Sequence, residues 1–501
     1  MSDRRMYAAV ATVAAAVYLG ALWNGFALDD IPLIALNPLV AYPSGLWRAF
    51  AHPYWPPDFG GHLYRPLVIA GYTLDRLVDG TPWFHAVNLL WHAAATVSLA
   101  ALTRRLVDQG AGLVAGLLFA LHPVHVEAVA NVVGRAEPMA ALLAILTVYA
   151  ALAGWPAAWS AAAFALGLLS KENAAVAPAL VVWAWILGLE RPGRRRIIAL
   201  GAGWGAVAAA YTVVRALVLH PYGAYASIAP MFIGQTPLAV RLTAVAALAD
   251  VARLLVFPLT LRVDYSPNER TAVTSFFDLR LAAGLVCALA WGALLVLAWR
   301  RGRKVEAFGL GWLGVALLPV ANLLFPVGFY LAERTLYLPS AGLVVAVAAA
   351  LARWLPERLR PVVAVVCLLA AARVAFRVPV WHDDTAVTES ILENSPASYG
   401  GPARMAGVYL DHHQPEKALA AARIAAGLMQ RDPWVYAIGA VAAFAAGHPG
   451  AADSLLSGLE RLCAGACAAG YYRYEAAQAR AHGYPATADS LLARAARPQA
   501  R

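Results

Sequence analysis

The chain has 501 residues, of which 61% are hydrophobic and only 14% are charged, and its formal net charge is +10. A soluble globular protein is about 25% charged, so this chain has too little polar surface to be one, and much of its surface must lie in lipid. The positive charge does not indicate nucleic-acid binding, because the basic residues form short runs between apolar segments, as membrane topology signals do.

Eleven apolar segments are candidates for membrane-spanning helices, which need about 17–25 residues each. They lie at 6–26, 84–103, 111–128, 137–153, 157–171, 174–190, 196–218, 279–299, 306–325, 335–353 and 361–378. The predicted fold class is therefore all-α: a polytopic membrane protein with about eleven transmembrane helices, followed by C-terminal helical repeats.

Basic residues in the short loops predict how these segments are oriented. With eleven crossings, every basic cluster lies on the cytoplasmic side: Arg4-Arg5, Arg104-Arg105, Arg191 to Arg196, Arg300 to Lys304 and Arg353 to Arg360. The N-terminus is then cytoplasmic and the C-terminal region lies across the membrane. A twelfth crossing at 237–258 would break this pattern, so we expect a re-entrant or interfacial element there, on the outer side.

The first outer loop, 27–82, is long and rich in Pro, Trp, Tyr and His, and we expect it to hold juxtamembrane helices. It opens with Asp29 and Asp30. Either carboxylate could cap a helix that begins near Ile31, or could act in catalysis, and the residues alone favour neither. Further along, Arg65 stands beside aromatic residues, where it could bind a lipid phosphate or only contact headgroups.

Four more polar motifs fall on the outer side: His122-Pro-Val-His125-Val-Glu127, Gly134-Arg135-Ala-Glu137, Lys171-Glu172, and Glu333-Arg334 with Tyr337. The histidines could bind a metal, transfer protons or contact a sugar, but their spacing is not the i, i+4 spacing of helical zinc motifs. If a metal binds, its ligands would be Asp29, Asp30, His122 and His125. Ion pairing inside a motif could explain any one of the charged motifs. Their convergence on one side instead favours an outward-facing cavity.

Such a cavity suits group transfer from a membrane-bound donor that carries a phosphate. A carboxylate would deprotonate an acceptor hydroxyl, and cations would stabilise the negative charge on the leaving phosphate. The sequence has no Walker A motif and no G-x-G-x-x-G after a predicted strand. We therefore expect a lipid-carried donor rather than a nucleotide.

The character of the chain changes near residue 380, where charges return. Three similar stretches, HQPEKALAAA, GHPGAADSLL and GYPATADSLL, place prolines at 415, 449 and 485. A period of about 34 residues is typical of tetratricopeptide (TPR) repeats, so we expect a transmembrane domain at 1–379 and about three repeats within 380–501; an unrelated helical bundle is the alternative. Cys463 and Cys467 are expected to be neighbours on one helix, with a disulfide only in an oxidising compartment.

Several motifs occur together in a characteristic order: YRPL (Tyr64–Leu67), FHAVNLLWH (Phe84–His92), LHPVHVEAVANVVGRAE (Leu121–Glu137), SKEN (Ser170–Asn173) and ERTLYLPSAG (Glu333–Gly342), followed by the repeats. This order resembles the transmembrane and TPR-containing O-mannosyltransferases, which are class C glycosyltransferases related to the protein O-mannosyltransferases. The resemblance implies an inverting enzyme that transfers a mannose-like sugar from a polyprenyl phosphate to Ser or Thr of exported proteins.

Carried onto this sequence, the resemblance makes Asp30 the expected base, with Asp29 orienting it. Expected acceptor and sugar contacts are His122, His125, Glu127, Glu137, Glu172 and Glu333. Expected phosphate contacts are Arg65, Arg135, Lys171, Arg334 and Tyr337. The repeat array is shorter than in eukaryotic relatives, and Asn173-Ala174 follows Lys171-Glu172 where Gln-Gly would be typical.

The compact, Ala-rich chain is typical of a bacterial member. We expect it in the bacterial inner membrane, with an undecaprenyl-phosphate donor and with the active site and repeats in the periplasm. The expected partners are the lipid-linked sugar, membrane lipid, and an acceptor protein or glycan bound by the repeats. No cofactor is firmly expected, and a divalent metal stays an alternative. Two other functions stay open: a non-catalytic membrane scaffold, and a transferase that modifies a lipid or surface glycan.

Overall fold

The computed structural model describes residues 2–57, 61–78, 80–222, 228–354, 360–463 and 465–496. Parts of two expected features, residues 355–359 of the last basic cluster and residues 58–60 and 79 of the first outer loop, lie outside this range, as do residues 497–501. The described residues form helices and turns, with one isolated bridge between Pro267 and Arg270 and no strand. The expected all-α class is confirmed.

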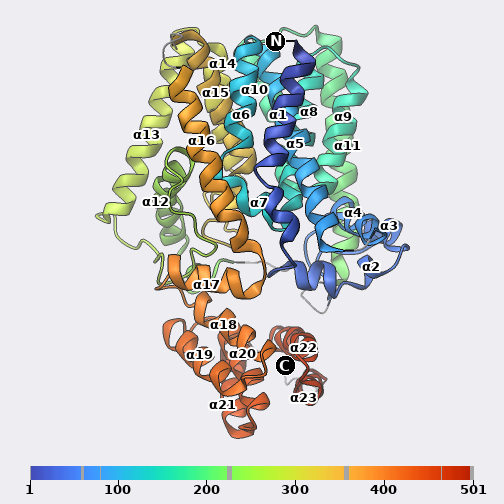
Figure 1. Ribbon diagram of the computed structural model, residues 1–501, viewed down its shortest axis with the longest axis vertical. Coiled ribbons are helices and arrows are strands. Elements are labelled where there is room, and N and C mark those ends of the chain that lie inside the picture. Colours follow the sequence, from blue (N-terminus) through green and yellow to red (C-terminus); the bar gives the residue numbers. More distant parts are fainter. Residues whose placement is uncertain are drawn as a thin grey trace.

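Figure 1 shows two bodies along the long axis of the molecule. The larger body is a bundle of roughly parallel helices that contains the N-terminus, and the smaller body is a group of helices that contains the C-terminus. The N-terminus lies at the end of the bundle remote from the smaller body. The N-terminus and the C-terminal repeats, which the sequence predicts to lie on opposite sides of the membrane, are thus at opposite ends of the molecule.

A helix lies in each of the eleven expected spans. These helices are α1 (Asp3–Ala16), α5 (Thr81–Leu106), α6 (Gln109–Ala120), α8 (Ala136–Leu152), α9 (Ala157–Ser170), α10 (Ala177–Ile186), α11 (Arg194–Leu219), α13 (Leu279–Arg300), α14 (Lys304–Leu317), α15 (Tyr337–Trp354) and α16 (Arg360–Arg377). Among the described residues, six helical segments, containing α5, α8, α11, α13, α15 and α16, are long and apolar enough to cross a membrane. A seventh would be α6 together with α7 (Val126–Ala130), which are bent by 50° at the turn η5 (Pro123–His125).

The chain is therefore a polytopic membrane protein, and the count of eleven crossings stays a prediction. The other helices, α1, α9, α10 and α14, have 10 to 14 residues, whereas a full crossing needs about 20. Sequence hydropathy marks where these helices occur but overestimates their lengths, because apolar residues continue into the turns that follow them.

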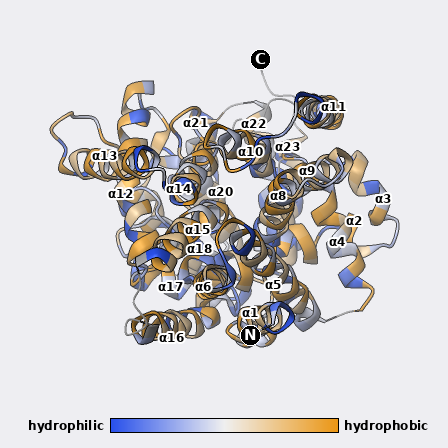
Figure 2. Ribbon diagram, turned by 90° about the horizontal axis from the view of Figure 1, so that it is seen from above, coloured by the Kyte–Doolittle hydropathy of each residue, from blue (hydrophilic) through white to orange (hydrophobic). Residues whose placement is uncertain are grey.

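Burial divides the long helices into inner and outer ones. Within α8 and its preceding turn, 89% of the apolar window is buried, whereas the windows of α11, α13 and α16 are 11%, 17% and 22% buried. Figure 2 shows α11, α13 and α16 at the rim of the bundle with hydrophobic residues on them. Apolar residues exposed at the rim are what a lipid-facing surface requires.

Small residues allow close contact between α14 and α15. A Cβ placed on Gly309 would lie 2.4 Å from the carbonyl oxygen of Gly342, and one on Gly342 would lie 2.5 Å from that of Gly309. Helices in membranes approach closely where both carry small residues. This contact fixes the start of α15, and with it the turn that carries Glu333 and Arg334.

The expected re-entrant or interfacial segment, 237–258, is a single helix, α12 (Pro237–Val256). It lies in the half of the bundle nearer the C-terminal body (Figure 1). Its charges are satisfied locally: Arg241 donates to the carbonyl of Asn322 at 2.7 Å, and Asp250 accepts from Arg270 at 2.9 and 3.0 Å. Its position relative to the membrane stays a prediction.

The first outer loop contains short helices: η1 (Leu19–Trp23) just before it, then η2 (Ile31–Ala35), α2 (Pro38–Ala41), α3 (Gly45–Arg48), η3 (Ala49–Ala51) and α4 (Pro66–Arg76). Asp30 precedes η2, but its side chain does not cap that helix. Tyr42 and Trp47 are 64% and 65% exposed. Aromatic residues in such positions are favoured at a membrane surface.

The C-terminal body follows the turn η12 (Val378–Trp381). Its helices are α17 (Asp384–Asn394), α18 (Gly400–Asp411), α19 (Pro415–Leu428), α20 (Pro433–Ala445), α21 (Pro449–Leu462), α22 (Ala466–Ala481) and α23 (Pro485–Ala495). Helices α18 to α23 form three consecutive hairpins, and the repeated prolines begin the second helix of each. This is the expected number of units; their assignment as TPR repeats stays a prediction.

Cys463 and Cys467 form a disulfide, with their Cα atoms 5.5 Å apart. Cys463 follows the end of α21 and Cys467 lies in the first turn of α22. The expectation that they are neighbours on one helix is therefore wrong: Gly465, with φ of +68°, interrupts the helix between them.

Candidate active site

Charged side chains from distant parts of the sequence gather at the end of the bundle that faces the C-terminal body. We call this group the charged cluster. It consists of Asp29, Arg65, Glu127, Glu137, Lys171, Glu172 and Arg334. All seven are among the residues that the sequence singled out.

Helix starts position most of the cluster. Glu137 lies in the first turn of α8, after the turn η6 (Val133–Arg135). Lys171 and Glu172 lie at the start of η7 (Glu172–Val176), which leads into α10, and Arg334 lies in η10 (Glu333–Leu336), which leads into α15. The positive ends of these helix dipoles point toward the cluster, which favours an anion there.

The ion pairs in the cluster connect different motifs. Arg65 donates to Glu172 Oε2 from Nη2 at 2.9 Å and from Nε at 3.1 Å. Lys171 pairs with Glu137. Pairing inside a motif, between Arg135 and Glu137 or between Lys171 and Glu172, does not occur.

Arg334 is held by Glu127 through two contacts. Its guanidinium pairs with Oε1, and its backbone N–H donates to Oε2 at 2.8 Å. The second contact fixes the backbone of η10 against α7. The side chain of Arg334 is 33% exposed, so it is partly accessible from solvent.

The three cations influence one another electrostatically through Lys171. Lys171 interacts electrostatically with both Arg65 and Arg334. The guanidinium of Arg65 also lies 5.1 Å from the ring centre of Tyr54. Each of the three cations is also paired with a glutamate, which balances its charge.

The two aspartates lie in different environments. Asp30 is 1% exposed, and its carboxylate accepts from the backbone N–H of Val133 at 2.7 Å and of Ala27 at 3.1 Å. Burial raises the pKa of Asp30 to about 8, against the lowering by these two bonds. Asp30 therefore joins the first outer loop to η6.

Asp29 is partly exposed, and its carboxylate makes no hydrogen bond or ion pair with any residue that the structure describes. It interacts electrostatically with Arg334. Of the two carboxylates, the one that is unpaired and partly exposed is the one available to accept a proton from a bound molecule. The geometry thus favours Asp29 over Asp30 as the base, the reverse of the expected order.

Arg135 was expected to contact phosphate, but it is buried and each of its three guanidinium nitrogens is bonded within the protein. It is 0% exposed, donates from Nε to Asn88 Oδ1 at 2.6 Å and from Nη2 to the carbonyl of Phe84 at 2.8 Å, and pairs with Asp75 through Nη1. These bonds join α4, α5 and η6. Arg135 therefore holds the elements next to the charged cluster together, and it does not line the cluster.

Glu333 turns away from its neighbour Arg334. Its Oε1 accepts from the backbone N–H of Arg262 at 2.5 Å and from the hydroxyl of Tyr265 at 2.9 Å. It therefore anchors the segment after α12.

The remaining expected residues form a buried aromatic group. His125 lies 2.8 Å from Ser340 Oγ through Nε2, and the Tyr337 hydroxyl lies 2.6 Å from Nδ1 of His92. The ring centres of His125 and Tyr337 are 4.3 Å apart, and both residues are 0% exposed. His122 contacts the carbonyl of Leu255 at 3.1 Å. Tyr337 interacts electrostatically with Glu137 of the charged cluster, whereas the hydrogen bonds given above for these side chains are to residues outside the cluster.

The four residues that were expected to hold a metal do not come together. Within the described ranges, no group of three or more His, Cys, Asp or Glu side chains is arranged to bind an ion. His122 and His125 have ring centres 5.4 Å apart, but the carboxylate of Asp30 is bonded to backbone N–H groups of Val133 and Ala27.

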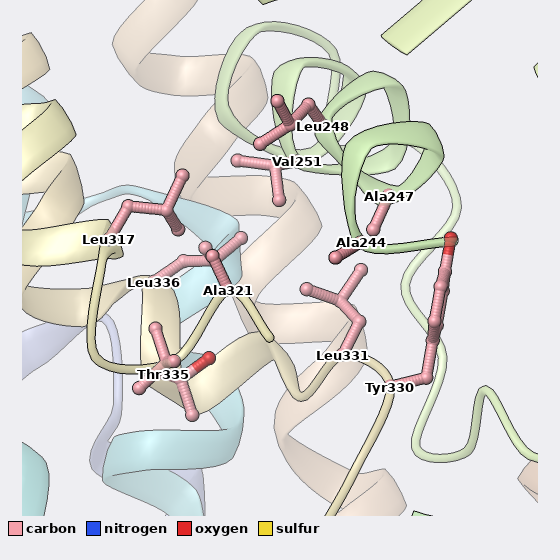
Figure 3. A pocket seen from close by; sticks show the side chains of 11 residues that line it. Ala244, Ala247, Leu248, Val251, Leu317, Ala321, Tyr330, Leu331, Thr335 and Leu336 are labelled. Atoms are coloured by element: carbon pink, nitrogen blue, oxygen red, sulfur yellow. The ribbon is translucent and has the colours of Figure 1, made fainter. Parts of the chain in front are cut away.

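A small apolar pocket lies between α12 and the connection from α14 to α15 (Figure 3). It is lined by Ala244, Ala247, Leu248, Val251, Leu317, Val320, Ala321, Tyr330, Leu331, Thr335 and Leu336. None of its lining residues carries a charge, so it cannot perform the chemistry of the cluster. One of its lining residues, Thr335, directly follows Arg334 in the sequence. The pocket therefore provides an apolar surface beside the charged cluster.

Sequence reasoning missed two residues beside Arg65. Tyr54 stacks on it, and Tyr211, on α11, interacts electrostatically with Arg65 and Glu172. Tyr54 lies in the aromatic-rich loop that the sequence did mark as structured. Tyr211 stands alone in an apolar helix, and no local pattern could have assigned it.

The fold and the cluster define the class: a polytopic helical membrane protein with a polar site where the bundle meets a C-terminal helical domain. No protein-family model matches the chain. Individual proteins, however, are similar to it in sequence. Protein O-mannosyl-transferase TMTC3 of Mus musculus is 27% identical over 380 residues, which is 68% of this chain and 41% of that protein. Tmtc2 of Drosophila melanogaster is 34% identical over 313 residues, which is 56% of this chain and 33% of that protein.

Protein O-mannosyl-transferase TMTC4 of Mus musculus is 27% identical over 453 residues, covering 74% of this chain and 59% of that protein. The homologues of this chain are thus the TMTC family of protein O-mannosyl-transferases, which confirms the family resemblance seen in the motifs. The chain spans less than half the length of the first two relatives.

Proposed function

We propose that this protein is an integral membrane glycosyltransferase that moves a mannose-like sugar from a polyprenyl-phosphate donor to a Ser or Thr hydroxyl of an exported protein. The observation that carries the proposal is the unpaired carboxylate of Asp29, which interacts electrostatically with Arg334 of the charged cluster. The names of the relatives support the sugar and the protein acceptor.

In this proposal the cations bind the donor phosphate. Arg334 and Arg65 offer guanidinium groups that match phosphate oxygens, and Lys171 adds a point charge between them. Their carboxylate partners, Glu127, Glu172 and Glu137, hold them in place. We therefore assign these three acids to positioning the cations rather than to contacting the sugar directly.

The chemistry needs one proton acceptor and one stabilised leaving group. Asp29 takes the proton of the acceptor hydroxyl as its oxygen bonds to the anomeric carbon. The bond between that carbon and the phosphate oxygen breaks, and the electron pair leaves with the polyprenyl phosphate. The cations stabilise the charge that develops there. Attack from the face opposite the phosphate inverts the anomeric configuration.

Five expected contacts are left out of the proposed site because their side chains are bonded or buried elsewhere. They are Arg135, Tyr337, His122, His125 and Glu333. We assign them to the scaffold that surrounds the cluster.

We further propose that the site faces the outer side of a bacterial inner membrane, with the N-terminus in the cytoplasm and the repeats in the periplasm. The repeats would then hold the acceptor polypeptide next to the cluster. The placement of the N-terminus and the repeats at opposite ends of the bundle supports this orientation (Figure 1).

A transfer assay with purified protein in lipid nanodiscs tests the proposal. The donor is radiolabelled polyprenyl-phosphate mannose and the acceptor is a mixture of Ser/Thr-rich peptides. Lys171→Gln and Arg334→Gln are expected to raise the donor KM about 10- to 100-fold, the effect of losing one charge-assisted hydrogen bond. Arg423→Gln is the matched control, because Arg423 is exposed on α19.

Unchanged donor KM in both variants would contradict the phosphate site. If the label appears only in lipid or glycan, the acceptor is a lipid or a surface glycan and not a protein. Absence of transfer to any acceptor, with partners still retained by the repeats, would support the scaffold function instead.

A further inference from the structure

The segment that leads into Asp29 is held by the connection between the bundle and the repeats. The backbone N–H of Gly25 donates to the carbonyl of His382 at 2.8 Å, and the side chain of Asn24 donates to the carbonyl of Val378 at 3.2 Å. The backbone N–H of Leu28 donates to Asp384 Oδ1 at 2.5 Å. Residues more than 350 positions apart in the sequence thus form one structural unit.

Leu28, directly before Asp29, has an unfavourable backbone conformation. Its φ is +52°, in the left-handed region that costs an L-residue about 1–2 kcal/mol. Such a conformation persists only where the surroundings hold it. The hydrogen bond from Leu28 to the Asp384 carboxylate is of the stronger, charge-assisted kind, and it acts on the strained residue itself.

Asp384 also faces the repeat domain. It interacts electrostatically with Arg404 on α18, with Asp411 at the end of α18, and with His482 at the end of α22. His482 and Asp411 pair with each other, which joins the first hairpin to the third. The same carboxylate therefore contacts the loop of the proposed base and lies among charges of the first and third hairpins.

A second contact supports this connection. Tyr474, on α22, interacts electrostatically with both Asp29 and Arg404. The repeats thus reach the Asp29 loop from α22 as well as through α17.

We infer that Asp384 is a positioning residue for sugar transfer: it holds Leu28 in its left-handed conformation so that Asp29 is directed toward Arg334, and it links that geometry to the repeat domain. The inference rests on the proposed role of Asp29 as the base. Asp384 itself touches neither the donor nor the reacting hydroxyl.

Adjacent carboxylates provide a matched test. Asp384→Ala removes the acceptor for Leu28, whereas Asp384→Asn keeps an oxygen in place. Asp383→Ala is the control, because Asp383 caps the same helix by accepting from Ala386 N at 2.9 Å and has no bond to the Asp29 loop. In the transfer assay, Asp384→Ala is expected to lower kcat about 10- to 100-fold without changing the donor KM, as misplacement of a catalytic group does. Asp384→Asn should keep most of the activity.

A rescue variant separates positioning from general stability. Glycine adopts positive φ readily, so Leu28→Gly in the Asp384→Ala background is expected to recover part of the lost kcat. Amide hydrogen exchange of the peptide 24–30, measured on the full chain, should rise in Asp384→Ala and not in Asp383→Ala. This second readout needs no transfer.

The two failures are distinguishable. If Asp384→Ala matches Asp383→Ala in exchange of the peptide 24–30, or matches it in kcat, the positioning role is overturned. If Asp29→Asn transfers sugar normally, the proposed base is overturned, whereas the exchange result still reports whether Asp384 holds the loop.

Discussion

Asp29 and Asp30 are adjacent in the sequence and differ in every property that matters for catalysis. Asp30 is buried and bonded to two backbone N–H groups, whereas Asp29 is partly exposed and unpaired among the described residues. Leu28, directly before the pair, has a positive φ of +52°. The different environments of two adjacent carboxylates depend on the local backbone, which the residue types alone do not reveal.

Asp30→Asn should destabilise the fold. The amide supplies one acceptor oxygen and places an N–H₂ group against a backbone N–H, so one buried donor loses its partner. The expected cost is about 1–3 kcal/mol in the free energy of unfolding, measured by thermal unfolding in detergent. Full stability combined with loss of transfer would instead identify Asp30 as the base.

The site residues were predicted more completely than their partners. All seven members of the charged cluster were selected because charges beside hydrocarbon are costly and suggest function. Their pairing could not be predicted, since Arg65 and Glu172 are 107 positions apart and Arg334 and Glu127 are 207 apart. Arg135 was selected for the same reason but is bonded within the protein. A buried structural cation and a phosphate-binding cation cannot be distinguished from the sequence alone.

At the scale of elements, the helices were predicted well because long apolar runs have few other stable forms in a membrane. The repeat period likewise predicted about three helical units, and the structure has three hairpins. What hydropathy could not give was helix length, the bend between α6 and α7, or the break between Cys463 and Cys467. Each depends on tertiary packing or on a single glycine rather than on average composition.

Helix α22 carries a carboxylate that predicts pH-dependent stability. Glu475 is 1% exposed, and neither of its oxygens has a hydrogen-bond partner in the described part of the chain. Burial raises its pKa from 4.5 to about 8, so the folded state favours the protonated form. The stabilising contribution is complete below the unfolded pKa and is lost as pH rises through the folded pKa.

Thermal unfolding of the full chain should therefore show declining stability of the repeat domain between about pH 4.5 and 8. Glu475→Gln should remove that part of the decline. Glu389→Gln is the control, because Glu389 is exposed on α17. Equal pH dependence in Glu475→Gln and the parent protein would show that Glu475 is not the titrating group.

The whole molecule places its two ends on opposite sides of the apolar bundle (Figure 1). Five of the expected spans lie between Gly193 and Gly450, so these two positions should lie on opposite sides of the membrane. A Cβ at either glycine meets no atom within 4 Å, so cysteine can replace both without strain. The free cysteines Cys287 and Cys367 would first be replaced by alanine.

A membrane-impermeant maleimide added to intact spheroplasts should label Gly450→Cys and leave Gly193→Cys unlabelled until lysis. Labelling of both positions before lysis would require an even number of crossings between them. In that case the repeats and the cytoplasmic loop before α11 would share one side, and the proposed periplasmic site would be wrong.

The most direct measurement of the central claim is the transfer rate of Asp29→Asn. The variant keeps the size of the side chain and removes its ability to accept a proton. It should lower kcat about 100-fold or more, the usual contribution of a general base, while the donor KM and thermal stability stay at parental values. A variant that transfers mannose at the parental rate would contradict the assignment of Asp29 and, with it, the proposed active site.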